Sequence, residues 1–372
     1  MKKLDASFFN NHKTITNLSN SFLSHYGLNP FHAPIEEVLN AIKGRRKIAV
    51  FLFDGLGKAI LEAYPKEARY ILEHSFLDIY STNPATTVAS TTSFLTAKTP
   101  IETGYLGWTV QFKDYSFPIE AFSNRNALTG EEVASFNLME KRCPTKKIDV
   151  LLREKGIKAS CLFPFPIAKD GPRNFEDIYL EASSFFNDGG EFLYIYVPEP
   201  DHTLHEEGVI SKKVATLIIE ENALIEHFVN RHPDVLVFSL SDHGMVDIEY
   251  QDIAKEKDIV ESLAKPISLE GRTTSFFIKE DKKEIFQKAF LKRFPNFTLL
   301  TKEEVIQSKY FGEGEASSYS LDFIGDFVSI SLGNDFLFDS RYKRDNLYFK
   351  GHHAGGKKEE REILLSLYNR NY

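Results

Sequence analysis

The chain has 372 residues, of which 42% are hydrophobic and 13% aromatic, and its formal net charge is −8. This composition supports a sizeable packed core and excludes an intrinsically disordered chain. Acidic and basic residues are mixed along the sequence, and without a concentrated basic patch we expect no binding to duplex nucleic acid. Small phosphate compounds stay possible as ligands, because bound cations can reverse the local charge.

Cysteine usage and the N-terminus bear on the compartment. Cys143 and Cys161 form neither a CxxC motif nor a disulfide framework, and two reduced thiols fit a cytoplasmic protein. The charged first residues are followed by the polar residues 10–13 and not by an apolar segment, so we infer no signal peptide. No apolar run approaches the roughly 18 residues of a membrane-spanning helix. We therefore expect a cytoplasmic protein without a membrane span, and the sequence leaves its oligomeric state open.

The sequence of the first part of the chain predicts strands that alternate with helices. Residues 1–46 are predicted to be an N-terminal helical extension that packs on the main domain. Residues 47–53 form a nearly continuous apolar run, which is typical of a parallel strand buried on both faces. Residues 58–74 then show helical spacing, and residues 76–80 predict the next strand. A further helix is expected to begin near Thr87.

Residues 100–145 are irregular and aromatic, and we expect a loop excursion near the functional site. Alternation then resumes, with strands predicted over 157–163, 192–197, 234–240 and 324–332 and helices over 146–155, 209–230 and 357–369. Residues 261–317 change character and predict a small α/β insertion, which leaves 47–260 and 318–372 as the core. The pattern predicts an α/β fold with a mostly parallel central sheet and helices on both faces.

Acidic side chains follow three of the predicted strands. Asp54, Asp201 and Asp242 stand at or just after strand ends, where open α/β sheets bind their ligands. His205 follows Asp201 by four residues, so on a helix both side chains would lie on one face. His243 is adjacent to Asp242. Imidazole and carboxylate donors suit zinc, with manganese or iron as alternatives.

Closely spaced hydroxyl residues lie between the predicted strand at 76–80 and the helix expected to begin near Thr87. Thr87 lies at the expected start of a helix, where unpaired N–H groups and the helix dipole favour a phosphate group. We take Thr87 as the candidate nucleophile. The alternative is an ordinary threonine or serine N-cap without catalytic function.

These segments together resemble the type I phosphodiesterase/nucleotide pyrophosphatase family of the alkaline phosphatase superfamily. The matching segments are, in order, Asp54-Gly55, Pro84-x-x-Thr87, Glu199-Pro200-Asp201-x-x-x-His205, Ser241-Asp242-His243-Gly244-Met245 and Gly351-x-His353. They extend over most of residues 47–372. The resemblance implies an alkaline-phosphatase-like three-layer fold and a phosphodiesterase or pyrophosphatase activity.

The family pattern also implies a role for each matching residue. Thr87 is the nucleophile and forms a phospho-threonine intermediate. One divalent metal ion would be held by Asp54, Asp242, His243 and the Thr87 oxygen, and a second by Asp201, His205 and His353. His352 is the alternative to His353. The resemblance therefore implies a small phosphate-ester substrate and two divalent ions, with Zn²⁺ as the first expectation and Mn²⁺ as the alternative.

The chain departs from the nucleotide-specific pattern at two positions. Trp108 stands where an asparagine often donates to a phosphate oxygen, and Val88 stands where an aromatic ring commonly stacks on a base. Tyr196, at a second stacking position, is retained and is either a stacking residue or an ordinary strand residue. We take Tyr196 and Trp108 as candidate substrate-binding residues, while nucleotide specificity stays open.

Other motifs and functions compete with this interpretation. A dinucleotide-binding loop at Gly55-x-Gly57 lacks its third glycine, which is Ile60, and Asp54 would repel a pyrophosphate. A P-loop beginning at Gly351 lacks the final serine or threonine, which is Lys358. Two alternatives stay open: a phosphomonoester or phosphonate hydrolase on the same metals, and a catalytically inactive metal-binding scaffold.

Overall fold

The structure is a computed structural model that describes residues 13–342 and 348–369. The central sheet is formed by β1 (Ile48–Phe53), β2 (Ser75–Tyr80), β5 (Ala159–Leu162), β6 (Phe192–Val197), β7 (Leu236–Leu240) and β16 (Glu362–Tyr368). Their order is β2-β16-β7-β1-β6-β5. The β7, β1, β6 and β5 strands pair in parallel, whereas β16 is antiparallel to both β2 and β7. The sheet is thus mostly parallel, as predicted.

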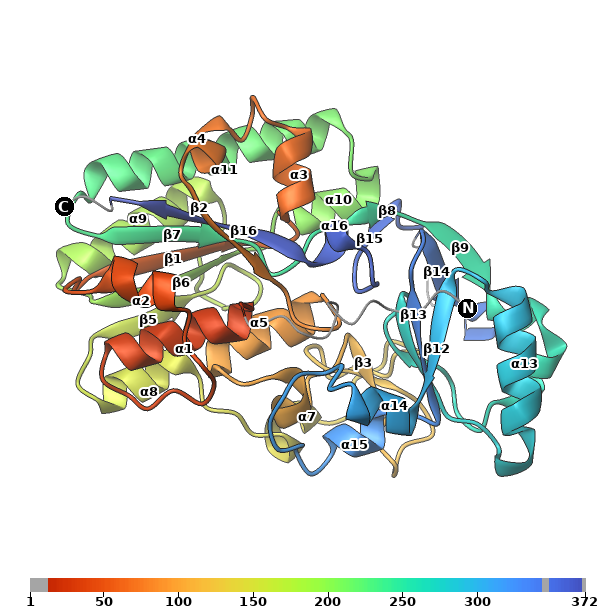
Figure 1. Cartoon of the computed structure of the whole chain (residues 1–372). Coiled ribbons are helices and arrows are strands. Elements are labelled where there is room, and N and C mark those ends of the chain that lie inside the picture. The colour runs from red at the N-terminus through yellow and green to blue at the C-terminus, as the bar shows by residue number, and fades with distance from the viewer. Residues whose placement is uncertain (1–12, 343–347, 370–372) are drawn as a thin grey trace.

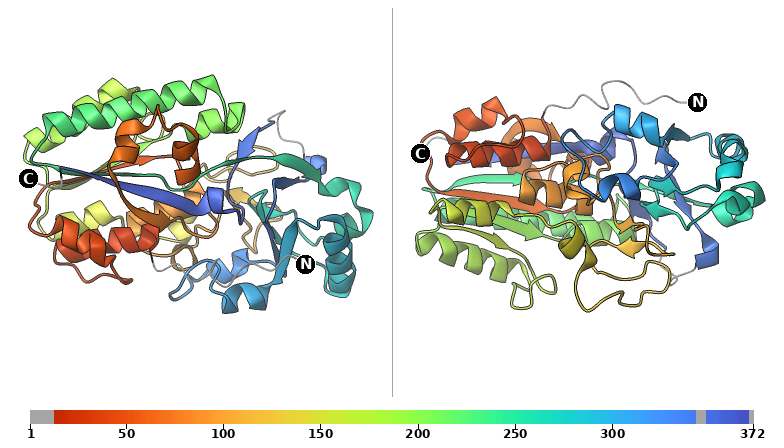
Figure 2. Two further views of the ribbon diagram at one scale, coloured as in Figure 1. Left: turned by 45° about the horizontal axis from the view of Figure 1, so that its top comes forward. Right: turned by 90° about the horizontal axis from the view of Figure 1, so that it is seen from below.

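Alternating residues of β1 explain why helices cover both faces of this sheet. Val50 and Leu52 enter one hydrophobic cluster, and Phe51 and Phe53 enter another on the opposite face. The first face is covered by α1 (Ile15–His25), α2 (Glu36–Ile42), α5 (Thr87–Thr96) and α8 (Ile148–Glu154). The second face is covered by α3 (Lys58–Ala63), α4 (Arg69–Glu73), α9 (Phe175–Asn187), α10 (Asp201–Glu207) and α11 (Lys212–Arg231). The result is the predicted three-layer arrangement (Figures 1 and 2).

A second sheet lies beside the first and is antiparallel throughout. It is formed by β3 (Thr109–Val110), β4 (Ile119–Glu120), β10 (Ser268–Leu269), β11 (Thr273–Phe276), β12 (Phe297–Thr301) and β13 (Phe327–Ser331). Their order is β12-β13-β11-β10-β3-β4. On one face Phe286 and Phe290 of α13 (Lys283–Arg293) pack against it. Two of its strands thus come from the aromatic excursion at residues 100–145.

The remaining elements are short. They are the helices α6 (Pro100–Thr103), α7 (Leu138–Arg142), α12 (Lys257–Ser262), α14 (Lys302–Gln307), α15 (Ser320–Phe323) and α16 (Lys358–Arg361), the 3-10 turns η2 (Ile253–Lys255), η3 (Glu280–Lys282) and η4 (Ser340–Tyr342), and the strands β8 (Val246–Asp247), β9 (Glu249–Asp252), β14 (Asp335–Phe338) and β15 (Gly351–His352). The pair β9–β14 is parallel and the pair β8–β15 antiparallel.

Two predicted elements are wrong. Residues 324–332 were expected in the central sheet, but β13 pairs with β11 and β12 in the second sheet. The predicted closing helix at 357–369 is helical only in α16, and the rest is β16. Leu365 and Leu364 of β16 enter opposite hydrophobic clusters, so pairing and burial on both faces override the helix propensity of this segment. The division into an extension, a core and an insertion stays a prediction.

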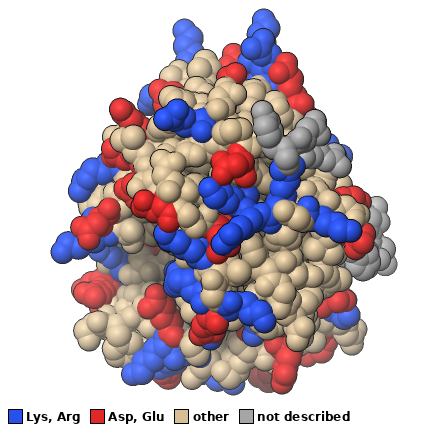
Figure 3. Space-filling view, turned by 90° about the vertical axis from the view of Figure 1, so that its left-hand side faces the viewer, with Lys and Arg blue, Asp and Glu red and all other residues tan. Residues whose placement is uncertain are grey.

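The surface charges and the helices of the folded chain bear on its possible partners. On the face drawn in Figure 3, basic and acidic side chains lie among one another. Within the described ranges, no helix combines the length and the apolar character that crossing a membrane requires.

Candidate active site

The carboxyl ends of the parallel strands place the predicted residues at one edge of the central sheet. Asp54 directly follows β1, and Asp242 and His243 come shortly after β7. Asp201 is the first residue of α10, which follows β6. Thr87 is the first residue of α5 and lies in the loop-to-helix junction after β2, as predicted. The fold therefore brings these segments together because parallel strands end at the same edge.

One group of donors surrounds the Thr87 hydroxyl. The atoms offered by Asp54, Asp242 and His243 all lie within 4.8 Å of one another. His243 Nε2 lies 3.3 Å from Asp54 Oδ1 and 3.5 Å from Asp242 Oδ2. Thr87 Oγ1 lies 3.1 Å from His243 Nε2 and 3.4 Å from Asp54 Oδ1. The structure thus brings together the four residues that the sequence assigned to the first ion.

A second group adjoins the first. Asp201, His353 and the shared His243 offer atoms that also lie within 4.8 Å of one another. His205 Nε2 lies 3.4 Å from Asp201 Oδ2, and His353 Nε2 lies 3.9 Å from Asp201 Oδ1. His205 and Asp201 share one face of α10, as their spacing predicted. His243 and His353 stack with ring centroids 3.8 Å apart, which joins the two groups.

The donor set fits divalent metal ions. Two ligand atoms bound about 2.0–2.1 Å from one tetrahedral zinc ion lie roughly 3.3 Å apart. The separations of 3.3, 3.4 and 3.5 Å between imidazole nitrogens and carboxylate oxygens are close to this value. Asp201 Oδ1 and Asp242 Oδ2 are buried and have no hydrogen-bond partner among the described residues. Buried carboxylate oxygens without a partner are costly unless a cation compensates them.

The donor side chains also have a second polar atom that lies within hydrogen-bond distance of the protein backbone. The Nδ1 atoms of His205, His243 and His353 lie 2.8, 3.1 and 3.2 Å from backbone carbonyl oxygens. If Nδ1 carries the proton in each ring, the Nε2 lone pair is free to bind an ion. Asp242 Oδ1 accepts the backbone N–H groups of Gly55 and His243, which leaves Oδ2 for the ion.

The short β8–β15 pair positions the last imidazole. His352 is opposite Val246 in this pair, so the loop that carries His353 lies against the loop that carries His243. Nδ1 of His352 accepts the backbone N–H of His353, and His352 belongs to neither donor group. His353 thus joins a donor group, whereas the His352 ring lies next to it, with its centroid 4.6 Å from that of His205. The choice of His353 over His352 as a ligand stays a prediction.

The carboxylates of the site repel one another. Burial, followed by the charges of Asp242 and Asp201, raises the pKa of Asp54 well above its ordinary value. Burial also raises the pKa of Asp242 to about 7. Burial opposes ionisation of Asp201 too, but the neighbouring His205 prevails and lowers its pKa to about 2. A bound cation would relieve this repulsion by favouring the ionised carboxylates.

Tyr196 lies beside the first donor group. It is buried, and its hydroxyl donates a hydrogen bond to Asp54 Oδ2. It is not among the residues that line the cavity in front of Thr87. Its phenol oxygen is tied to Asp54, so Tyr196 is placed to orient that carboxylate, and a substrate-binding role for Tyr196 stays a prediction.

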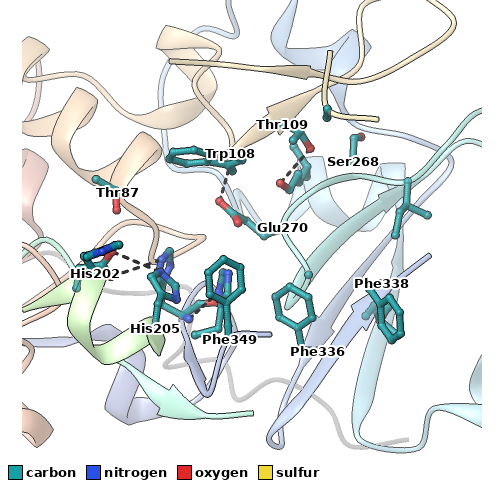
Figure 4. A pocket seen from close by; sticks show the side chains of 18 residues that line it. Thr87, Trp108, Thr109, His202, His205, Ser268, Glu270, Phe336, Phe338 and Phe349 are labelled. Atoms are coloured by element: carbon teal, nitrogen blue, oxygen red, sulfur yellow. Dashed lines mark hydrogen bonds and ion pairs between the residues drawn. The ribbon is translucent and has the colours of Figure 1, made fainter. Parts of the chain in front are cut away.

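A cavity of about 520 Å³ opens in front of Thr87. Trp108 lines it and is 42% exposed, and its role in substrate binding stays a prediction. Glu270 and the rings of Phe336 and Phe349 also line it, and the sequence did not point to them (Figure 4). They come from the second sheet and its connections and belong to no motif, so only the folded chain reveals them.

Comparisons with known proteins agree with this geometry. A family model described as type I phosphodiesterase/nucleotide pyrophosphatase matches residues 48–354. Murine ectonucleotide pyrophosphatase/phosphodiesterase 5 matches with a TM-score of 0.65 at 16% identity, covering 87% of this chain and 88% of that chain. An inactive threonine-to-alanine variant of the murine protein in complex with AMP gives the same values. The human counterpart, also 16% identical, has a TM-score of 0.63 and covers 87% of each chain.

Similarity at this level of identity shows the fold, which is the expected alkaline-phosphatase-like one. No curated protein sequence matches the chain. The family assignment rests on the family model, which spans the central sheet from β1 to the His353 loop. The chain therefore belongs to the type I phosphodiesterase/nucleotide pyrophosphatase family and is a metal-dependent hydrolase of phosphoric esters.

Proposed function

We propose that the protein hydrolyses phosphodiesters or phosphoanhydrides through a phospho-threonine intermediate on Thr87. The observation that carries this proposal is the position of the Thr87 hydroxyl. It lies 3.1 Å from His243 Nε2 and 3.4 Å from Asp54 Oδ1, beside both donor groups and at the wall of the cavity. No other hydroxyl is needed to explain the convergence of these donors.

The two groups would hold two divalent ions, with Zn²⁺ as the first expectation. Asp54, Asp242 and His243 would hold one ion. Asp201 would hold the other together with His205 and His353, whose Nε2 atoms lie 3.4 and 3.9 Å from its carboxylate oxygens. When bound, such ions would lower the pKa of the threonine hydroxyl and offset charge on the attacking and leaving oxygens. The protein's own part is to hold these donors in place and to keep Thr87 at the start of α5.

The reaction has two displacements at phosphorus. Thr87 Oγ1 forms a bond to phosphorus as the bond to the leaving-group oxygen breaks, which gives the phospho-threonine. Water then attacks the same phosphorus, the bond to Thr87 breaks, and the hydroxyl is restored. The N-terminus of α5 adds backbone N–H groups and a positive dipole end near the phosphoryl group.

The cavity favours a diester over a monoester. A phosphomonoester carries close to two negative charges, and phosphatase sites that accept it need additional positive charge. Among the described residues that line the cavity there is no lysine or arginine. The phosphomonoester and phosphonate alternatives are therefore less well supported, and rates on bis-p-nitrophenyl phosphate and p-nitrophenyl phosphate would separate them. Nucleotide esters are one class to include, because the murine relative was solved with AMP.

Replacing Thr87 tests the proposal. Thr87→Ala should lower kcat/KM on the best diester by about a thousandfold or more, because the nucleophile is lost. The variant should keep its circular dichroism spectrum. Thr216→Ala, which truncates an exposed threonine of α11, serves as the control and should keep wild-type activity. Unchanged turnover in Thr87→Ala would refute the role of Thr87.

Removal of metal tests the inactive-scaffold alternative. Elemental analysis should find zinc or manganese, and EDTA should abolish hydrolysis until a divalent ion is added back. A protein that binds metal but hydrolyses no ester in a broad screen would support the scaffold instead.

A further inference from the structure

The N-terminus of α5, which carries the proposed nucleophile, is not capped by its own threonine. Thr86 is the N-cap residue, with φ −141° and ψ 148°, yet its side chain makes no cap hydrogen bond. Thr14 and Thr301 also have an extended backbone at the starts of α1 and α14, and there the hydroxyl accepts the N–H of the third helical residue. The residue type and the backbone of Thr86 therefore suit a cap, but its hydroxyl is directed elsewhere.

Glu270 is the partner of the Thr86 hydroxyl. Thr86 is 0% exposed, and its Oγ1 donates to Glu270 Oε1 over 2.6 Å. The same Oε1 accepts the backbone N–H of Trp108 at 2.7 Å, a bond drawn in Figure 4. The Glu270 backbone is fixed between β10 and β11 by bonds of 2.9 and 2.7 Å to the Thr273 carbonyl and from Thr274 Oγ1. Because a buried hydroxyl is costly without a partner, this carboxylate decides the orientation of the Thr86 side chain.

The first N–H groups of α5 stay open as a result. Within the described chain, the N–H groups of Thr87, Val88 and Ala89 meet no hydrogen-bond acceptor. Thr87 lines the cavity, and the adjoining donor group includes Asp242, whose buried Oδ2 also lacks a partner among the described residues. Open N–H groups thus lie beside the donors for a cation, which is the combination that a phosphoryl group requires.

We propose that Glu270 is a positioning residue, which keeps the Thr86 hydroxyl away from α5 and so preserves the helix N-terminus as a binding site for the phosphoryl group. This proposal rests on the proposed phosphodiesterase function. Without an acceptor at position 270, rotation of the Thr86 side chain brings Oγ1 to the N–H of Val88 or Ala89, where an N-cap threonine normally binds. The cap then competes with the phosphoryl oxygens for the same N–H groups, and binding of the anion weakens.

Two variants that both remove the charge of residue 270 test the proposal. Glu270→Gln keeps an acceptor oxygen for Thr86, whereas Glu270→Leu lacks one. Inorganic phosphate is the probe, and isothermal titration calorimetry of the metal-loaded protein measures its affinity. Phosphate should bind Glu270→Leu about fivefold more weakly than Glu270→Gln, which corresponds to the roughly 1 kcal/mol of a threonine cap. Equal affinities in the two variants would overturn the proposal.

Removal of the Thr86 hydroxyl separates this mechanism from a merely structural role of Glu270. Valine has the shape of threonine but cannot cap a helix. The double variant Thr86→Val/Glu270→Leu should therefore regain the phosphate affinity of Glu270→Gln. If the double variant stays as weak as Glu270→Leu, the loss arises in the cavity wall and not through Thr86, and the proposal fails.

A second pair of variants leaves Glu270 intact, so it serves even where Glu270→Leu does not fold. In Thr86→Asn the side-chain oxygen can cap α5 while the amide group donates to Glu270. Phosphate should bind Thr86→Asn about fivefold more weakly than Thr86→Val, since asparagine occupies the N–H groups that valine leaves open. Equal affinities here would show that the end of α5 does not bind the anion.

Kinetics distinguish failure of this inference from failure of the proposed function. On bis-p-nitrophenyl phosphate, kcat/KM of Glu270→Leu should lie about fivefold below that of Glu270→Gln and recover in the double variant. Hydrolysis of the ester with equal phosphate affinities in all variants would reject the role of Glu270 and keep the phosphodiesterase. The expected order of phosphate affinities without hydrolysis of any ester would keep the role of Glu270 and reject the phosphodiesterase.

Discussion

At the scale of single residues, the site depends on side chains that have one atom committed to the protein and one left for an ion. Asp242 is held through Oδ1 by two backbone N–H groups, and Oδ2 is left without a partner. Asp54 follows the same rule, since Tyr196 donates to its Oδ2 and Oδ1 faces His243. Partners of this kind fix the orientation of a ligand and preserve metal affinity.

Tyr196→Phe tests this role. Without the phenol hydroxyl, Asp54 can rotate, and the affinity for the metal ion should fall by about 10–100-fold. The measurement is competition between the protein and a fluorescent zinc chelator. Tyr194→Phe is a matched control on the same strand, because the buried Tyr194 hydroxyl has no hydrogen-bond partner in the described part of the chain. Equal affinities in wild type and Tyr196→Phe would show that Tyr196 does not position the ligand.

The residues of the donor groups could be predicted from sequence because each lies in a short local pattern. Asp201 and His205 share a helical face, and Asp54, Asp242 and His243 follow apolar strands. Glu270 could not be predicted in this way. It lies in a short turn of the second sheet, and its neighbours Thr86 and Trp108 are more than 150 residues away along the chain.

At the scale of elements, α11 carries a carboxyl group in an unusual, fully buried position. Glu221 lies on its buried face with 0% exposure, and both carboxylate oxygens lack a hydrogen-bond partner among the described residues. Burial, followed by the charges of Glu199 and Glu220, raises its pKa well above the ordinary value. The folded state therefore prefers the protonated side chain, and its stability falls as the pH rises from the unfolded pKa of about 4.3 towards the folded pKa.

Glu221→Gln should remove this pH-dependent loss. At pH 7.5 the free energy of unfolding should exceed the wild-type value by more than about 1 kcal/mol, and the difference should vanish near pH 4. Urea denaturation at several pH values measures it. Glu226→Gln, on the exposed side of the same helix, should change the unfolding free energy by less than about 0.5 kcal/mol. A difference that is independent of pH would contradict the assignment.

The error at β16 shows what element prediction from sequence lacks. The segment after α16 is rich in leucine, which favours helices in isolation. The β16 strand lies between β2 and β7, which are far away in the sequence. The alternating burial of β16 side chains on the two faces of the sheet arises only when β2 and β7 are in place. The strongly apolar β1, β6 and β7 were predictable because a run buried on both faces is itself the signal.

At the scale of the molecule, the cavity is lined by residues of the second sheet, such as Thr109, Ser268 and Leu269, together with residues of α10, β14 and the His353 loop. A buried ion pair ties the second sheet to α16. Arg272, next to β11, makes two hydrogen bonds of 2.7 and 2.9 Å to Glu360 of α16, and both side chains are 0% exposed. Glu360 also accepts the backbone N–H of Gly355, close to the His353 loop.

Arg272→Ala should therefore destabilise the whole protein. Loss of one partner leaves the Glu360 charge buried and uncompensated, at a cost of about 3–5 kcal/mol. Guanidinium denaturation measures the free energy of unfolding. Arg69→Ala, which removes an exposed pair with Glu73, should cost less than about 1 kcal/mol. If the two losses are equal, the buried pair does not hold the sheets together.

The overall architecture could be predicted from strand and helix alternation, but the second sheet could not. Its β3 and β4 strands have two residues each, too short for a periodic signal, and they join β10 across a long stretch of sequence. This sheet contributes Thr109, Ser268 and Leu269 to the lining of the cavity. The residues that line the cavity therefore follow from the fold, whereas the candidate metal-binding residues follow from motifs.

The central claim is that Thr87 becomes covalently bonded to phosphorus during turnover, and the stereochemical course at phosphorus tests it most directly. A chiral phosphorothioate diester hydrolysed in ¹⁸O-labelled water should give a product with retained configuration, because two in-line displacements each invert the centre. Inversion of configuration would mean that water attacks the substrate directly, and it would contradict the account.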